Sequence, residues 1–114
     1  MHRATGRCVA LSPVRNVAVY LDGIFANLRI IAQLFASLTV AFYCDQSYDG
    51  TLQKLQLLAR RQQQQDGSFR VFVLTPPAED NMPVFRTWRI ARARNRLMQF
   101  AEQQEENFDY MIAF

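Results

Sequence analysis

The sequence predicts an open α/β domain, because short apolar segments alternate along the chain with segments of helical periodicity. Strands that alternate with helices in this way form right-handed βαβ units and a parallel sheet with helices on both faces. The 114 residues are enough for one domain with one core, and half of them are hydrophobic. We therefore expect a Rossmann-like open parallel sheet in the order βαβαβαβ, with a tail over residues 1–6 and one domain over residues 7–114.

The first half of the chain contains two expected strands with a helix between them. Residues 8–11 form a short apolar run that a Ser-Pro pair ends, which is typical of a strand. From residue 17 to residue 35 the apolar side chains fall at helical spacing, since residues three and four positions apart share one face of a helix. Residues 38–44 are apolar on both faces, as expected of a central parallel strand.

The second half predicts two more helices and two more strands. Asp49 is placed to cap a helix whose leucines share one face, and that helix is expected to fray into the glutamine run 62–65. A third strand is expected over residues 69–74, followed by a proline-rich loop. A long helix then spans residues 85–105, and a fourth strand spans residues 108–114. Because this last strand stops without a turn signal, we expect a fragment or a truncated gene product.

The topology directs attention to the segments that follow the strands, because ligands of parallel sheets bind outside the carboxyl ends. These segments are residues 12–16, residues 45–49, residues 75–83 and whatever follows Phe114. Asp45 comes directly after the second strand, where an acid accepts hydrogen bonds from a ribose hydroxyl or a base N–H, although a turn or cap residue would fit equally. No Gly-x-Gly-x-x-Gly follows the first strand, which disfavours a dinucleotide site.

The long helix is dense in arginine, and its arginines fall on different faces. One stripe consists of Arg86, Arg89, Arg92 and Arg96, and another of Ile90, Ala91, Leu97, Met98 and Ala101. The first stripe is interpreted as a solvated face, with Arg89 near the first turn as a candidate ligand contact. Arg94 falls inside the apolar stripe, where an unpaired buried charge would be costly. We expect its partner to be a carboxylate such as Asp45 or a bound diphosphate.

The remaining reactive or aromatic residues give weaker indications. Cys8 and Cys44 lie in expected strands without metal-ligand spacing, so buried thiols are expected, with a disulfide as the other possibility. His2 is the only histidine and lies in the tail, which excludes a Ser-His-Asp or Cys-His site. Trp88 falls opposite the apolar stripe, where it would either stack on a base or pack against a further part of the protein.

Charge and hydropathy limit the partners. The net charge of +3 is supplied almost wholly by arginine, and this modest excess does not indicate nucleic-acid binding by itself. No apolar run reaches the roughly 18 residues that a membrane span needs, and the first residues make a poor signal peptide. We expect a cytoplasmic protein, or one associated with a membrane through regions outside this chain.

Four segments share a pattern when taken in order. Residues 11–16 read Leu-Ser-Pro-Val-Arg-Asn with Tyr-Leu shortly after, residues 44–51 read Cys-Asp-Gln-Ser-Tyr-Asp-Gly-Thr, residues 93–95 read Ala-Arg-Asn, and residues 108–114 read Phe-Asp-Tyr-Met-Ile-Ala-Phe. The set resembles family 2-like glycosyltransferases with the GT-A fold. Their counterparts are Pro-Val-Tyr-Asn-Glu, Asp-Asp-Gly-Ser-Thr-Asp-Gly-Thr, Ala-Arg-Asn and Glu-Tyr-Ile-Ala-Phe. The resemblance spans nearly the whole chain.

The resemblance implies a nucleotide-diphosphate sugar as ligand, with a glycan, lipid or protein as acceptor. It implies base or ribose contacts at Pro13 and Asp45 and a nucleotide-side role for Arg94. The predicted nucleotide-binding residues are Ser12, Pro13, Arg15, Asp45, Arg89 and Arg94. The metal-binding Asp-x-Asp motif would follow Phe114, so a divalent metal (Mn²⁺ or Mg²⁺) is expected only in a longer protein, and no catalytic residue is expected in this chain.

Two departures and two alternatives accompany the resemblance. Val17 stands where the family has glutamate, and Cys44 stands where it has the first aspartate of the pair. One alternative is another nucleotide-binding α/β module, such as a nucleotidyltransferase-like domain. The other is a non-catalytic module that grips a polyanion with its arginine-rich helix. On the glycosyltransferase interpretation the chain alone is expected to bind a nucleotide weakly and not to turn over.

Overall fold

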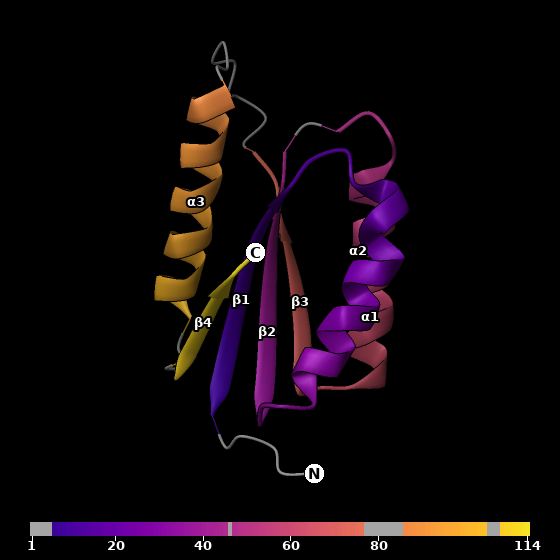
Figure 1. Ribbon diagram of the computed structural model, residues 1–114, viewed down its shortest axis with the longest axis vertical. Helices are drawn as coiled ribbons and strands as arrows, with labels where there is room; N and C mark the ends of the chain where they lie inside the picture. Colours follow the sequence, from indigo (N-terminus) through magenta and orange to yellow (C-terminus); the bar gives the residue numbers. More distant parts are fainter. Residues whose placement is uncertain (1–5, 46, 77–85, 105–107) are drawn as a thin grey trace.

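A computed structural model describes residues 6–45, 47–76, 86–104 and 108–114. Its sheet has four strands, which are β1 (Arg7–Val14), β2 (Ser37–Cys44), β3 (Phe69–Leu74) and β4 (Tyr110–Ala113). All strand pairs are parallel, and the strand order is β3-β2-β1-β4 (Figure 1). The predicted Rossmann-like open α/β fold is therefore confirmed.

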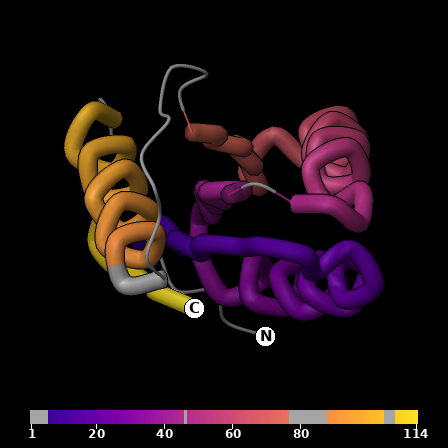
Figure 2. The backbone as a smooth tube through the Cα atoms, turned by 90° about the horizontal axis from the view of Figure 1, so that it is seen from above, coloured from indigo at the N-terminus to yellow at the C-terminus, as the bar shows by residue number. Residues whose placement is uncertain are grey.

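The helices cover the two faces of this sheet unequally. They are α1 (Leu21–Ala32), which a single 3₁₀ turn (Ala18–Tyr20) precedes, α2 (Thr51–Gln65) and α3 (Arg86–Gln103). Figure 2 looks along the strands and shows α1 and α2 on one face and α3 on the other. Right-handed crossovers require this arrangement, because the chain advances from β1 to β3 in one direction and then crosses back to place β4 beside β1.

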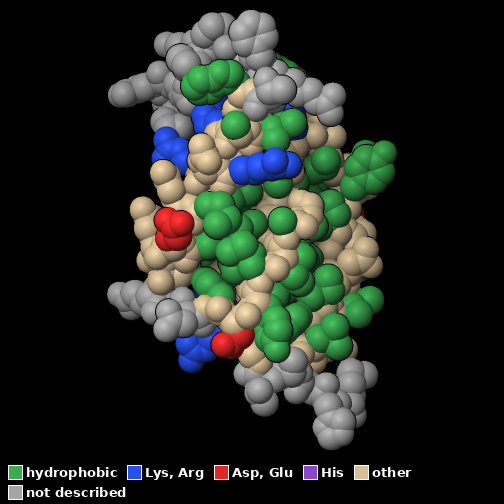
Figure 3. Space-filling model, turned by 60° about the vertical axis from the view of Figure 1, so that its left-hand side comes forward, with side chains coloured by type: hydrophobic (Ala, Val, Ile, Leu, Met, Phe, Trp, Pro, Cys, Tyr) green, Lys and Arg blue, Asp and Glu red, His purple; other side chains and the backbone are tan. Residues whose placement is uncertain are grey.

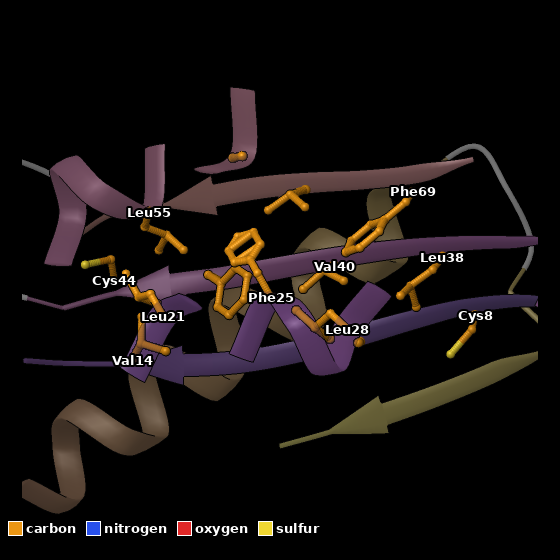
Figure 4. Packing of buried hydrophobic residues seen from close by; sticks show 14 residues of the cluster. Cys8, Val14, Leu21, Phe25, Leu28, Leu38, Val40, Cys44, Leu55 and Phe69 are labelled. Carbon is orange, nitrogen blue, oxygen red and sulfur yellow. The ribbon is translucent and has the colours of Figure 1, made fainter. Parts of the chain in front are cut away.

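The larger core lies between the sheet and the α1/α2 layer. Phe25 of α1 stacks on Phe42 of β2 with ring centroids 5.7 Å apart, and both side chains are buried (Figure 4). Cys8 and Cys44 are buried free thiols at opposite ends of this core, as the buried-thiol interpretation predicted. Burial raises the pKa of both thiols above the ordinary value.

The smaller core lies between the sheet and α3. It consists of Val9, Leu11, Ala41, Tyr43, Ala93 and Leu97. Because β2 contributes alternate side chains to both cores, it is buried on both faces, as its sequence predicted.

Two helix ends differ from the sequence-based expectation. The first helix begins at Leu21 rather than Val17, after the 3₁₀ turn. The N–H of Val17 donates to the hydroxyl of Thr51 at the start of α2, and the N–H of Ala18 donates to the carboxylate of Asp49. The glutamine run does not fray but continues α2 as far as Gln65. Gln62 is buried, since it falls one and two turns after the buried Ala59 and Leu55 on the same face of the helix.

No helix in the described part of the chain combines the length and the hydrophobicity that crossing a membrane requires.

Candidate functional site

The candidate site lies at the carboxyl ends of β1 and β2, beside the first turns of α3. An open cavity of about 350 Å³ there is lined by Pro13, Val14, Arg15, Tyr43, Asp45, Arg89, Ile90 and Ala93. The strand order reverses next to β1, because β2 and β4 lie on its two sides. The switch point at which open α/β sheets bind their ligands lies between β1 and β4, and this cavity borders it on the β2 side of β1. The structure thus brings together four predicted residues, Pro13, Arg15, Asp45 and Arg89.

Asp45 forms an ion pair across the sheet–helix interface. Its Oδ1 lies 3.7 Å from Nη2 of Arg92, and the two side chains are only 12% and 16% exposed. The backbone fixes its position, since the Asp45 N–H donates to the carbonyl of Val14 over 3.1 Å. The carbonyl of Asp45 in turn accepts a hydrogen bond from the Ser47 hydroxyl, at 3.0 Å. The acid therefore stands at the cavity in a defined orientation.

The pairing of Asp45 corrects the sequence-based assignment of the arginines. Arg92 was expected on a solvated face, and Arg94 was expected to need a buried partner. In the structure Arg92 is the arginine paired with Asp45, whereas Arg94 is exposed. Arg94 lines a different cavity of about 380 Å³, beside β4, whose walls are largely apolar side chains such as Leu97, Met98 and Phe114.

The reason is a rotation of α3 relative to the predicted apolar stripe. Ala93 and Leu97 are the buried residues of α3, and Phe100 and Ala101 extend that face. The other predicted members of the stripe are exposed, with Ile90 at 38% and Met98 at 41%, as is Ala91. Ala93 packs on side chains of β1 and β2, and the adjacent Arg92 lies within ion-pair distance of Asp45. The four-residue spacing of Ala93 and Leu97 is the sequence signal that could have identified this face.

Tyr43 is a site residue that the sequence analysis missed. Its side chain is fully buried and lines the cavity, two residues before Asp45. Burial raises the pKa of the phenol, as does the charge of Asp45, whereas Arg92 and Arg96 act in the opposite direction. Although both arginines are near enough to have this effect, no described group forms a hydrogen bond of ordinary geometry with the Tyr43 hydroxyl.

Hydrogen bonds link the β1–α1 connection to the β2–α2 connection at this edge of the sheet. Asn16 adopts a left-handed backbone with φ of 52°. Its N–H donates to the Ser47 hydroxyl over 3.1 Å, and its side-chain oxygen accepts the Tyr48 N–H over 2.8 Å. The β1–α1 and β2–α2 connections are therefore joined directly beneath the candidate site.

Asp49 joins the same two connections and caps α2 in part. Its carboxylate accepts hydrogen bonds from the hydroxyl and the N–H of Thr51, the first residue of the helix. It also accepts the N–H of Ala18 over 3.1 Å. The formal capping position is Gly50, which has a left-handed φ of 81°. The bond from the Thr51 hydroxyl, with those from the backbone, holds the pKa of Asp49 below its usual value.

The other residues singled out in the sequence do not meet at this cavity. Ser12 is buried in β1 and does not line it. Trp88 is 56% exposed and lies on a broad open cavity of about 590 Å³ along α3, with Ala91, Arg92, Asn95, Arg96 and Gln99. The side chain of Arg86 and most of the expected 75–83 segment lie outside the described residues.

Among the residues that the structure describes, no three histidine, cysteine or acidic side chains come close enough to hold a metal ion. Comparison of this chain with protein-family models, with curated proteins and with solved structures finds no match in any of the three.

Proposed function

We propose that the chain binds the nucleoside diphosphate part of a nucleotide sugar, as the donor-binding part of a glycosyltransferase. The cavity at the carboxyl ends of β1 and β2 is the observation that carries this proposal. Its volume lies in the range of small-molecule sites, and its polar side chains come from three separate segments of the chain. Support also comes from the four segments that resemble this enzyme family in sequence.

The polar groups of the cavity divide into two kinds. Asp45 presents carboxylate oxygens, which accept hydrogen bonds from ribose hydroxyls or a base N–H, while its pairing with Arg92 holds it in place. Arg15 and Arg89 present guanidinium groups, whose planar donors match phosphate oxygens. Sugar transfer releases a nucleoside diphosphate, and positive groups that neutralise its developing charge assist that step. The described residues supply no ligand set for Mn²⁺ or Mg²⁺.

The proposal is tested by titrating the chain with UDP, GDP and ADP and with their sugar conjugates, using calorimetry and NMR shifts. Saturable binding with a preference for one nucleotide is expected. Loss of the hydrogen bonds to Asp45 in Asp45→Ala should weaken binding about tenfold or more. Asp45→Asn keeps the shape of the side chain and should lose affinity while retaining the fold. Asp22→Asn is the matched control, since Asp22 is exposed on α1 and pairs with Lys54.

Unchanged nucleotide affinity in Asp45→Asn and in Arg89→Ala, with both variants folded, would remove the basis for this site. The same titration, repeated at several salt concentrations, distinguishes the proposed nucleotide-sugar site from the alternative of a polyanion-binding module. The broad cavity along α3 favours that alternative, because it combines the exposed Trp88 with Arg92 and Arg96. The affinity for a polyanion would fall steeply with added salt, because the logarithm of the binding constant falls linearly with the logarithm of the salt concentration. A nucleotide sugar would instead depend on the identity of its base.

A further inference from the structure

A second polar pocket lies on the other side of α3, between this helix and the carboxyl end of β3. It has a volume of about 330 Å³. Its polar side chains are Tyr43, Thr75, Arg96, Gln99 and Gln103. Of these, only Tyr43 also lines the nucleotide cavity. The pocket is therefore adjacent to that cavity but is built from different residues.

The groups around this pocket are suited to an anion. No described carboxylate lines it, and none lies within ion-pair distance of Arg96. The nearby Asp45 is paired with Arg92, so among the described residues no carboxylate compensates the charge of Arg96. Hydroxyl, amide and guanidinium groups all supply N–H or O–H donors. A ligand that offers several acceptor oxygens would match them, whereas a cation would not.

Tyr43 indicates where such a ligand would sit. Its side chain is fully buried, and within the described residues its hydroxyl forms no hydrogen bond of ordinary geometry, although the Arg92 guanidinium lies near it. A buried polar group without a partner destabilises the folded state, because it has lost its hydrogen bonds to water. Since burial raises the pKa of this phenol, it stays protonated at neutral pH and is able to donate. Arg92 and, more weakly, Arg96 act on the same phenol, and Arg96 is the one of the two that lines this pocket.

We propose that this pocket binds a phosphate group, with the Tyr43 hydroxyl and the Arg96 guanidinium as its central donors. Thr75, Gln99 and Gln103 line the same pocket and would donate to the remaining oxygens. The site goes beyond the proposed nucleotide function, because four of its five polar residues do not belong to the nucleotide cavity. The phosphate would come either as the free inorganic ion or as a phosphomonoester.

The test measures the melting temperature and binding heat of the chain with inorganic phosphate, against sodium chloride at equal ionic strength. Wild-type protein should be stabilised saturably by phosphate, since a ligand that binds only the folded state raises its stability. Glucose 1-phosphate serves as the phosphomonoester arm. Tighter binding of that compound would indicate a phosphorylated metabolite as the natural occupant, and tighter binding of inorganic phosphate would indicate the free ion.

Two variants and one control make the result specific. Tyr43→Phe should melt at an unchanged or higher temperature without phosphate, because it removes the unpartnered hydroxyl, and should bind phosphate about tenfold more weakly. Arg96→Gln, at an exposed position, should fold normally and lose phosphate binding to a similar extent. Arg60→Gln removes an exposed arginine from α2 and should respond like wild type.

The inference is overturned if phosphate stabilises wild type no more than chloride does, or if Tyr43→Phe and Arg96→Gln both respond like wild type. A Tyr43→Phe variant that melts lower in the absence of phosphate also contradicts it, since the hydroxyl would then be satisfied already. Nucleotide affinity in Arg96→Gln separates the two proposals. Loss of phosphate binding with intact nucleotide binding would show that this pocket is a site separate from the nucleotide cavity. Intact phosphate binding in this variant would contradict the role of Arg96 in the pocket and would leave the nucleotide proposal unaffected.

Discussion

Asp45 and Arg92 show how a single pair of residues links the sheet to the candidate site. The pair is largely withdrawn from solvent, so either charge alone would face a desolvation cost. Its separation of 3.7 Å is longer than that of a close ion pair. Asp45, for which the sequence resemblance implies a base or ribose contact, is thus held in place by the fold and lines the cavity.

At the residue scale, Asp49 predicts that the free energy of unfolding depends on pH. Its hydrogen bonds from Thr51 and from the backbone lower its pKa in the folded state below the ordinary value of 3.8. A lowered pKa means that the stabilisation is fully present above the unfolded-state value and is lost as the pH falls through the folded-state value. Urea unfolding at pH 6, 4 and 3 should therefore show wild type losing stability more steeply than Asp49→Asn below pH 4.

The comparison needs an exposed carboxylate elsewhere in the fold. Asp22→Asn on α1 serves as this control, since Asp22 accepts a hydrogen bond from the Lys54 ammonium and is remote in sequence from Thr51. If Asp49→Asn follows wild type over this range, the bonds to Thr51 and Ala18 contribute no pH dependence to folding.

At the scale of elements, the sequence predicted that each strand and helix exists. It did not predict which face of a helix packs against the sheet. The alternation of apolar runs identified all four strands. The β1 strand extends beyond its predicted end to Val14, even through Pro13. Pairing of β1 with β4 stops at Leu11, so the missing N–H of the proline falls where β1 has only β2 beside it. Whether a strand tolerates a proline thus depends on which strands lie beside it and not on the local sequence.

Helix α3 explains why the sequence predicted some residues of the candidate site and not others. Residues that follow strands, such as Pro13 and Asp45, were found because topology places them at one edge of the sheet. Arg92 and Tyr43 were missed, because their roles depend on which face of α3 meets the sheet. Periodicity alone assigned Leu97 and Met98 to one stripe, and packing against β1 and β2 separates them.

The rotation of α3 predicts unequal effects for these two neighbours. Leu97 is 2% exposed, so Leu97→Ala should leave a cavity and lower the free energy of unfolding by about 2–4 kcal/mol. Met98 is 41% exposed, so Met98→Ala should cost less than about 1 kcal/mol. Urea denaturation followed by circular dichroism measures both. Equal losses would restore the broader stripe that the sequence predicted and would refute the observed orientation of α3.

At the scale of the whole molecule, the single described helix on one face of the sheet explains where both proposed ligand sites lie. Two helices cover the α1/α2 face, whereas α3 alone covers β1 and β2 on the other. Open space therefore remains on both sides of α3, beside β4 and beside β3, and at its amino-terminal end. Both proposed ligand sites occupy this incompletely covered face, and Tyr43 lies where they meet.

The same incomplete cover predicts self-association through β4. This strand forms an edge of the sheet and pairs only with β1 among the described strands. Tyr110, Met111 and Phe114 are about half exposed, and Figure 3 shows hydrophobic side chains gathered over the middle of this face. An exposed apolar edge strand offers unpaired backbone groups to another chain. Wild type should therefore associate as its concentration rises in sedimentation or light-scattering measurements.

Met111→Lys should reduce that association, because a charged side chain on an edge strand opposes the approach of a second strand. Gln33→Lys adds the same charge at an exposed position after α1 and serves as the control. If both variants reduce association equally, net charge rather than the β4 edge governs solubility. A reduction confined to Met111→Lys would locate the contact at β4, next to the apolar cavity that Arg94 borders.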